Sequence, residues 1–131
     1  MYSVLIVDDE EQILQMIQQI LEKLGYRVTP CHLATEALAY FRQEPLKYDL
    51  VITDMYMPQM TGLELLDQLL LCRSDTPVLL CTGFSELMDE KQAKAKGIRD
   101  YILKPIYRQE LAEKIRQILD NEAALVQGVA L

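Results

Sequence analysis

The chain has 131 residues, 50% of them hydrophobic and 25% charged, which fits one domain with a real hydrophobic core. Its net charge of −7 argues against a protein that binds nucleic acid directly, because no basic stripe is present to replace the counterions of the phosphate backbone. Asp8 comes too early for a secretory signal and no apolar run approaches membrane-spanning length, so we expect a cytoplasmic chain without a membrane segment.

The first half of the chain predicts three strands with a helix between each pair. The strands are the apolar runs at residues 3–8, 26–31 and 50–54. The first helix is closed by Gly25 in the position of a C-terminal cap, and the second covers residues 34–43. We expect apolar side chains on the inward faces of these helices, namely Ile13, Ile17, Leu21 and Leu24 in the first and Ala34, Ala37, Leu38 and Phe41 in the second.

The second half predicts two further strands and three helices. The strands are the runs at 78–81 and 100–103, and the helices lie near 62–72, near 86–96 and from about Tyr107 onward. The expected inward side chains are Leu63, Leu66 and Leu70 in the first of these helices and Leu111, Ile115, Ile118 and Leu119 in the last.

Five alternations of strand and helix imply an α/β protein with a parallel sheet covered by helices on both faces. The continuous apolar character of the strands supports this interpretation, because parallel strands are buried on both sides. We expect one domain over residues 1–121, with residues 122–131 as a C-terminal tail or an extension of the last helix.

Four of the predicted strands end in residues that handle phosphate or metal. Asp8 and Asp9 follow the first strand, Asp54 ends the third, Thr82 follows the fourth and Lys104 follows the fifth. Because the carboxyl ends of parallel strands lie along one edge of a sheet, where open α/β sheets bind ligands, we expect these side chains to share one pocket.

Three carboxylates crowd together only with help, since like charges repel and raise one another's pKa. A Mg²⁺ ion would provide that help, being a hard cation that takes carboxylates, carbonyls and waters. Asp54 is either a third metal ligand beside Asp8 and Asp9 or a nucleophile that forms an aspartyl phosphate. Lys104 would pair with a phosphoryl oxygen, and the Thr82 hydroxyl would meet another.

Each of these residues also has an ordinary structural interpretation. The acids after the first strand suit a helix N-terminus, and Asp54 suits a cap or a turn. Gly83 is either simple turn chemistry or room for water beside the phosphate, and Pro105 predicts a cis peptide that turns Lys104 inward. The occurrence of suitable residues at four strand ends favours a site over four separate caps and turns.

These residues resemble the receiver domain of two-component response regulators, over about residues 3–120. The matching motifs are VDDE at 7–10, Asp54 with MPQMTG from Met57, CTG ending at Gly83 and ILKP ending at Pro105. Each motif is modest alone, but their order and spacing in one small α/β domain are highly specific. The resemblance implies a flavodoxin-like, doubly wound five-stranded parallel sheet with the strand order 2-1-3-4-5.

The resemblance also implies roles for individual residues. Asp54 is expected as the phosphoacceptor, and Asp8 and Asp9 as the acidic pair for Mg²⁺, with the Met55 backbone carbonyl as a further ligand. Lys104 is expected to pair with the phosphate. The remaining implied positions are the switch residues Thr82 and Tyr101 and the loop residues Pro58, Gly62, Gly83 and Pro105.

The implied function is a phosphorylation switch rather than an enzyme acting on other substrates. A histidine kinase or a phosphotransfer domain would pass its phosphoryl group to Asp54, and the changed surface would then act on a downstream protein, with the chain a monomer or a phosphorylation-dependent dimer. The chain is either a stand-alone regulator or the receiver of a hybrid sensor histidine kinase.

Two other classes of protein remain open from the residues alone. A Mg²⁺-dependent phosphatase with an aspartyl nucleophile typically has a second Asp two places later, where this chain has Tyr56. A flavin-binding protein of similar fold needs a phosphate loop rich in hydroxyls and Gly after the first strand, whereas residues 8–11 are all acidic and would repel phosphate.

Overall fold

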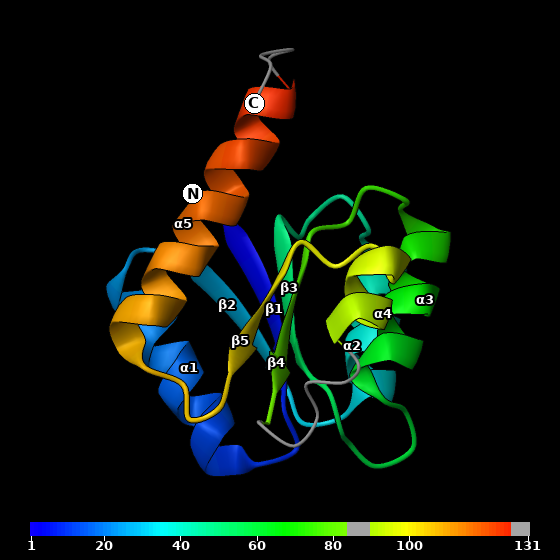
Figure 1. Ribbon diagram of the computed structural model, residues 1–131, viewed down its shortest axis with the longest axis horizontal. Coiled ribbons are helices and arrows are strands. Elements are labelled where there is room, and N and C mark those ends of the chain that lie inside the picture. The colour runs from blue at the N-terminus through cyan, green and yellow to red at the C-terminus, as the bar shows by residue number, and fades with distance from the viewer. Residues whose placement is uncertain (84–89, 127–131) are drawn as a thin grey trace.

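The computed structural model describes residues 1–83 and 90–126 and shows one parallel sheet between two layers of helices (Figure 1). The strands are β1 (Ser3–Val7), β2 (Arg27–Cys31), β3 (Leu50–Asp54), β4 (Val78–Thr82) and β5 (Asp100–Leu103). They pair in parallel in the order β2-β1-β3-β4-β5. The α/β, flavodoxin-like class with strand order 2-1-3-4-5 is therefore confirmed.

Helices cover both faces of the sheet. They are α1 (Glu11–Lys23), α2 (Ala34–Gln43), α3 (Gly62–Cys72), α4 (Glu90–Lys96) and α5 (Arg108–Val126). Helices α1 and α5 lie on one face and α2, α3 and α4 on the other (Figure 1). The helix expected near 86–96 begins at Glu90 within the described residues, and its first predicted turn, in 84–89, lies outside them. No helix in the described ranges is long and apolar enough to cross a membrane.

The sheet divides the interior into two apolar clusters, because successive strand residues face opposite sides. On the α2 and α3 side the cluster contains Leu5, Val51 and Leu80, all at most 2% exposed. On the α1 and α5 side it contains Ile6, Ile52 and Leu79. Strands β3 and β4 are buried along their whole length, as the continuous apolar runs predict for central parallel strands.

Most of the expected inward faces are confirmed. Every apolar residue predicted to face inward from α2 and α5 is buried. In α1 the prediction for Leu24 is wrong: this residue is 42% exposed, because the helix ends at Lys23 and the chain turns at Gly25 with a φ of 94°. In α3 the buried stripe also includes Leu65 and Leu69, two residues that the prediction omitted.

Both ends of the described chain lie at the end of the sheet where the strands begin. Strand β1 starts there at Ser3, and α5 runs back along the sheet so that its last described turn, ending at Val126, projects from the same end (Figure 1). The carboxyl ends of the strands therefore lie at the end opposite both termini.

Candidate functional site

The carboxyl ends of β1, β3, β4 and β5 meet along one edge, as parallel pairing requires. Asp54 pairs in register with Cys81, one position before Thr82, and Thr82 pairs with Leu103, one position before Lys104. Asp8 follows β1 directly, and its amide donates to the Cys31 carbonyl at the end of β2. The sheet thus brings the acids, the hydroxyl and the amine expected at this edge to neighbouring positions.

Three carboxylates gather at this edge. One oxygen each of Asp8, Asp9 and Asp54 lies within 4.8 Å of the others. Asp8 is 1% exposed and Asp54 7%, whereas Asp9 is exposed to solvent. A set of carboxylate oxygens with one open side fits a hard divalent cation such as Mg²⁺, which keeps several waters when it binds to proteins.

Lys104 brings the positive charge of the site. Its Nζ lies 3.0 Å from Oδ1 of Asp54 and 3.4 Å from Oδ2 of Asp8. Its backbone amide donates to the Thr82 carbonyl at 2.9 Å, which ties the end of β5 to the end of β4. The Lys104–Pro105 peptide bond is cis, as expected from the sequence. At the two distances given above, the Lys104 ammonium bridges the buried carboxylates of Asp54 and Asp8.

Burial sets the electrostatics of these groups. Burial raises the pKa of Asp54 to about 6, which the hydrogen bond from Lys104 opposes and the charge of Asp8 increases. Burial likewise raises the pKa of Asp8 above its ordinary value. Burial disfavours the charged form of Lys104, but the hydrogen bond and charge of Asp54 outweigh it, and the pKa of Lys104 is raised. One ammonium thus compensates the acids only partly, which is a reason for a cation to bind there.

The two oxygens of Asp54 differ in their surroundings. Oδ1 accepts the Met55 amide at 3.0 Å and contacts the Lys104 ammonium. Among the described residues no hydrogen bond to Oδ2 is found, and no buried side-chain oxygen lacks a partner, so Oδ2 is open to solvent. One carboxylate oxygen is fixed, and the other is available to a metal or a phosphorus atom.

The loop after β3 is held against the site by the start of α3. The Gly62 amide donates to the Met55 carbonyl at 2.7 Å. A Cβ at Gly62 would overlap the Asp54 carbonyl oxygen and lie 2.9 Å from Cδ1 of Leu80, so only glycine fits. The Met55 carbonyl, expected as a metal ligand, therefore already accepts one hydrogen bond.

A capping box at the start of α3 was missing from the sequence prediction. Thr61 Oγ1 accepts the Glu64 amide at 3.1 Å, and Glu64 Oε1 accepts the Thr61 amide at 3.0 Å. The signal was present as Thr-x-x-Glu before an apolar run. Pro58 lies exposed in the loop that this box anchors.

The two expected switch residues occupy different depths. Thr82 is 3% exposed at the end of β4. Tyr101 is half-buried in β5, and its ring lies 5.4 Å from Nζ of Lys94 in α4 and 5.6 Å from Nζ of Lys114 in α5. Tyr101 thus joins the edge strand to the helices on both sides of it.

A doubly wound parallel sheet with three acids, a hydroxyl and a lysine at its carboxyl edge defines a class of protein built for phosphoryl chemistry at a carboxylate. A family model for the response regulator receiver domain matches residues 4–116. The chain belongs to this family.

Relatives and solved structures agree with this assignment. The chain is 36% identical to the two-component response regulator ARR11 of Arabidopsis thaliana over 97% of its length and 26% of the relative. It is 39% identical to the uncharacterized transcriptional regulatory protein YkoG of Bacillus subtilis over 96% of its length and 54% of the relative. The chain thus spans about half or less of the length of these curated relatives.

Two solved structures have nearly the same fold. A receiver domain protein from Clostridium thermocellum has a TM-score of 0.91 at 31% identity, with 95% of this chain and 99% of that chain covered. A CheY-like receiver domain protein from Methanospirillum hungatei has a TM-score of 0.87 at 34% identity, with 94% and 97% covered. Receiver domains are signalling domains of two-component systems that typically use Mg²⁺ and phosphorylation and interact with kinases and output domains. Neither the phosphatase nor the flavin alternative finds support in these comparisons.

Proposed function

We propose that Asp54 is the phosphoacceptor and takes a phosphoryl group from the phosphohistidine of a histidine kinase or a phosphotransfer domain. The observation that supports this most is the asymmetry of the carboxylate, in which Oδ1 is held by the Met55 amide and Lys104 while Oδ2 is open. Attack by Oδ2 on phosphorus would form the new O–P bond as the P–N bond to the histidine breaks. The nitrogen keeps the electron pair of the broken bond.

We assign the metal ligands to Asp8, Asp9 and Asp54, whose oxygens already lie within 4.8 Å of one another. Mg²⁺ bound there would offset the negative charge of the phosphoryl oxygens. The Met55 carbonyl stays a proposed ligand, but one of its two lone pairs is taken by the Gly62 amide.

Lys104 and Thr82 would hold the transferred group. Lys104 is anchored at its backbone by the Thr82 carbonyl, so its ammonium can move from Asp54 to a phosphoryl oxygen without a change in the strand pairing. The Thr82 hydroxyl would donate to a second oxygen, with Gly83 leaving room beside it, and Tyr101 would follow Thr82. The surface formed by α4, β5 and α5 would then act on a downstream protein.

The proposal also covers the domain bounds, the activity, the oligomeric state and the location of the chain. We place the receiver domain at residues 1–121, and the continuation of α5 through Val126 supports residues 122–126 as an extension of this helix. We expect no turnover beyond phosphorylation and dephosphorylation of Asp54 itself, no direct contact with nucleic acid, and a monomer or a phosphorylation-dependent dimer. A cytoplasmic location and the choice between a stand-alone regulator and a hybrid kinase stay predictions.

Incubation with acetyl phosphate and Mg²⁺, followed by mass spectrometry of the intact protein, tests the acceptor. We expect an adduct of about 80 Da, the mass of one phosphoryl group. Asp54→Asn should abolish the adduct, and EDTA should suppress it in the unchanged protein. Asp120→Asn, a change at an exposed acid of α5, is the matched control and should leave the adduct intact.

The same experiment separates the alternatives. An adduct that persists in Asp54→Asn would assign the acceptor to another residue. Steady release of phosphate from a small phosphoester, with many turnovers per protein molecule, would support the phosphatase alternative instead.

A further inference from the structure

A cavity lies at the end of the sheet where the strands begin, opposite the acidic site. It is bounded by Tyr2, Asp49 and Pro77, which directly precede β1, β3 and β4, and by Leu119 and Ala123 in the last turns of α5. Its volume is about 260 Å³. That volume equals roughly nine water molecules at ~30 Å³ each, which is room for a small organic molecule of about nine non-hydrogen atoms. We call this space the basal cavity.

One wall of the basal cavity is apolar. Leu119 is 3% exposed and Pro77 is buried, so both present fixed apolar surface. The Tyr2 side chain is 40% exposed at the rim, with its ring centroid 6.4 Å from that of Tyr26. Sites for small molecules typically combine such apolar walls with a few polar groups that fix the orientation of the ligand.

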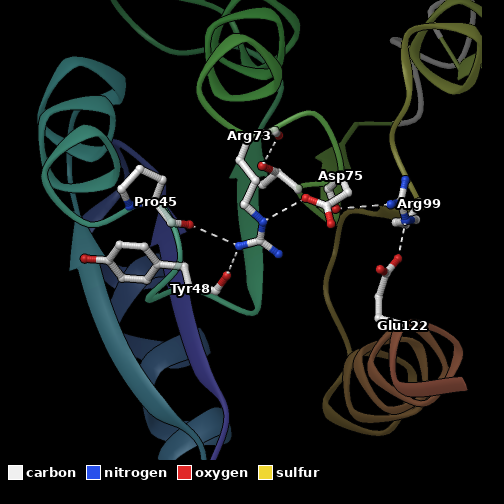
Figure 2. Close-up of polar contacts among 7 residues, drawn as sticks. Pro45, Tyr48, Arg73, Asp75, Arg99 and Glu122 are labelled. Atoms are coloured by element: carbon white, nitrogen blue, oxygen red, sulfur yellow. Dashed lines mark hydrogen bonds and ion pairs between the residues drawn. The ribbon is translucent and has the colours of Figure 1, made fainter. Parts of the chain in front are cut away.

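Arg73 supplies the positive charge of the cavity. Its side chain is 19% exposed; Nη1 donates to the carbonyls of Tyr48 at 2.7 Å and Pro45 at 3.1 Å, and Nε donates to Oδ1 of Asp75 at 3.0 Å. Among the described residues no hydrogen bond from Nη2 is found and no buried side-chain nitrogen lacks a partner, so Nη2 is accessible. Figure 2 shows Nη2 pointing away from Pro45 and Tyr48. A guanidinium held in place by its other two nitrogens thus offers this one to an acceptor.

Asp49 supplies a negative charge beside this guanidinium. Its Oδ2 accepts the Ser3 amide at 2.8 Å, which fixes the carboxylate against the start of β1. Within residues 1–83 and 90–126 neither a hydrogen bond to Oδ1 nor an ion pair of Asp49 is found. Asp49 directly follows Tyr48, whose carbonyl Arg73 holds, so the two charges lie close together. Oδ1 of Asp49 is therefore available to a cationic donor.

The other two acids at the cavity already have arginine partners. Asp75 pairs with Arg73, and Glu122 pairs with Arg99, which also donates from Nη2 to the Asp75 carbonyl at 3.3 Å (Figure 2). The charge left without a protein partner is that of Asp49, and the donor left without an acceptor is Nη2 of Arg73. The cavity thus offers one anionic and one cationic contact next to an apolar wall.

We propose that the basal cavity binds a free α-amino acid with an apolar side chain, about the size of leucine. Its carboxylate would accept from Nη2 of Arg73, its ammonium would donate to Oδ1 of Asp49, and its side chain would pack on Leu119 and Pro77. A simple anion would face the charge of Asp49 and a simple cation that of Arg73, so only a zwitterion satisfies both. This site goes beyond the proposed function and does not depend on phosphorylation of Asp54.

Titration of the full chain with leucine, followed by protein NMR, tests the proposal. We expect saturable binding with a Kd on the order of 0.1–1 mM, as suits a ligand of so few atoms. The amide resonances of Tyr2, Asp75 and Ala123 should shift on binding, whereas those of Asp8 and Asp54 should not. Absence of saturation at about ten times that concentration, or shifts confined to the acidic site, would overturn the proposal.

Two analogues of leucine test each charge without any change in the protein. Isocaproate lacks the ammonium, and isoamylamine lacks the carboxylate. Each should bind about tenfold more weakly than leucine or less tightly still, the factor for loss of one hydrogen bond to a charged group. Glycine, which has both charges but no apolar side chain, should also bind more weakly. An analogue with one charge that binds as tightly as leucine would overturn the proposal.

Two variants test the cavity itself. Asp49→Asn keeps an acceptor for the Ser3 amide but removes the charge, and should weaken leucine binding by about tenfold or more. Ala123→Phe should fill the cavity and abolish binding. The matched controls Asp67→Asn and Ala39→Phe change exposed positions and should bind leucine as the unchanged protein does. Unchanged affinity in either test variant would contradict the assignment. Circular dichroism checks that each variant is folded, and the analogues test the site in the unchanged protein.

Discussion

The Lys104 ammonium contacts the same oxygen of Asp54, Oδ1, that accepts the Met55 amide, at 3.0 Å in each case. Strand β3 and the end of β5 therefore fix one side of the carboxylate together. The lysine compensates the charge of Asp54 and, together with the Met55 amide, holds Oδ1 so that Oδ2 faces outward.

Lys104→Met should shift the pH dependence of phosphorylation. The hydrogen bond and charge of Lys104 lower the pKa of Asp54, which burial raises to about 6, so their loss should raise this pKa further. The initial rate of adduct formation from acetyl phosphate is measured from pH 5 to 9. We expect the pH at which this rate is half-maximal to be higher in Lys104→Met than in the unchanged protein by about one unit or more.

Lys91→Met provides the control for that profile, because Lys91 is exposed in α4. Its profile should follow that of the unchanged protein. Identical profiles for all three proteins would contradict the role given to Lys104.

Asp54→Asn should stabilise the metal-free protein at neutral pH. The pKa of Asp54 is raised in the folded state, to about 6 from 3.8, so its contribution to stability is fully present below pH 3.8 and is lost as the pH rises through 6. At pH 7.5 the amide should raise the free energy of unfolding by about 1–3 kcal/mol, reduced by the loss of the contact with Lys104.

Urea unfolding at pH 7.5 and at pH 4, in the presence of EDTA, measures this difference. The gain should shrink at pH 4, where the unchanged carboxyl is protonated in the folded state. Asp67→Asn, at an exposed position of α3, should show no such gain at either pH. A free energy of unfolding lower for Asp54→Asn than for the unchanged protein at pH 7.5 would contradict the predicted stabilisation.

Gly62→Ala should damage both stability and phosphorylation. The new methyl group would overlap the Asp54 carbonyl oxygen and press on Leu80, so the start of α3 must move away from the end of β3. We expect a loss of about 1–3 kcal/mol in the free energy of unfolding, typical of overpacking, together with slower adduct formation.

Gly25→Ala separates a steric effect from a backbone effect. Gly25 has a φ of 94° with no atom within 4 Å of an added Cβ, so alanine there strains only the backbone, by about 1 kcal/mol. Adduct formation should be normal in this variant. Equal phosphorylation rates in the two alanine variants would count against a positioning role for Gly62.

The edge residues were predictable because topology alone decides where they meet. Asp8, Asp54 and Lys104 are far apart in the chain, but each directly follows or ends a strand, and parallel pairing places these ends together. The prediction of which helix residues face inward was less accurate. Leu24 fits the helical spacing, yet the helix stops before it, and the sequence pattern locates helix ends only to within a few residues.

The contacts among Arg73, Asp75, Arg99 and Glu122, at the end of the sheet where the strands begin, could not be predicted from the sequence (Figure 2). Arg99 and Glu122 are charged residues without a motif, and they meet only because α5 continues past the matched family region and returns along the sheet. Nothing in the local sequence distinguishes them from more exposed surface charges, such as Lys96 and Asp67, which form an ion pair at 3.6 Å with both side chains about half exposed.

Because Ser3 at the start of β1 and Val126 at the end of α5 lie on the side away from the acids, folded units joined near either point would leave access to Asp54 open (Figure 1). The domain can therefore serve as an interchangeable module, inserted before, after or between other folded units.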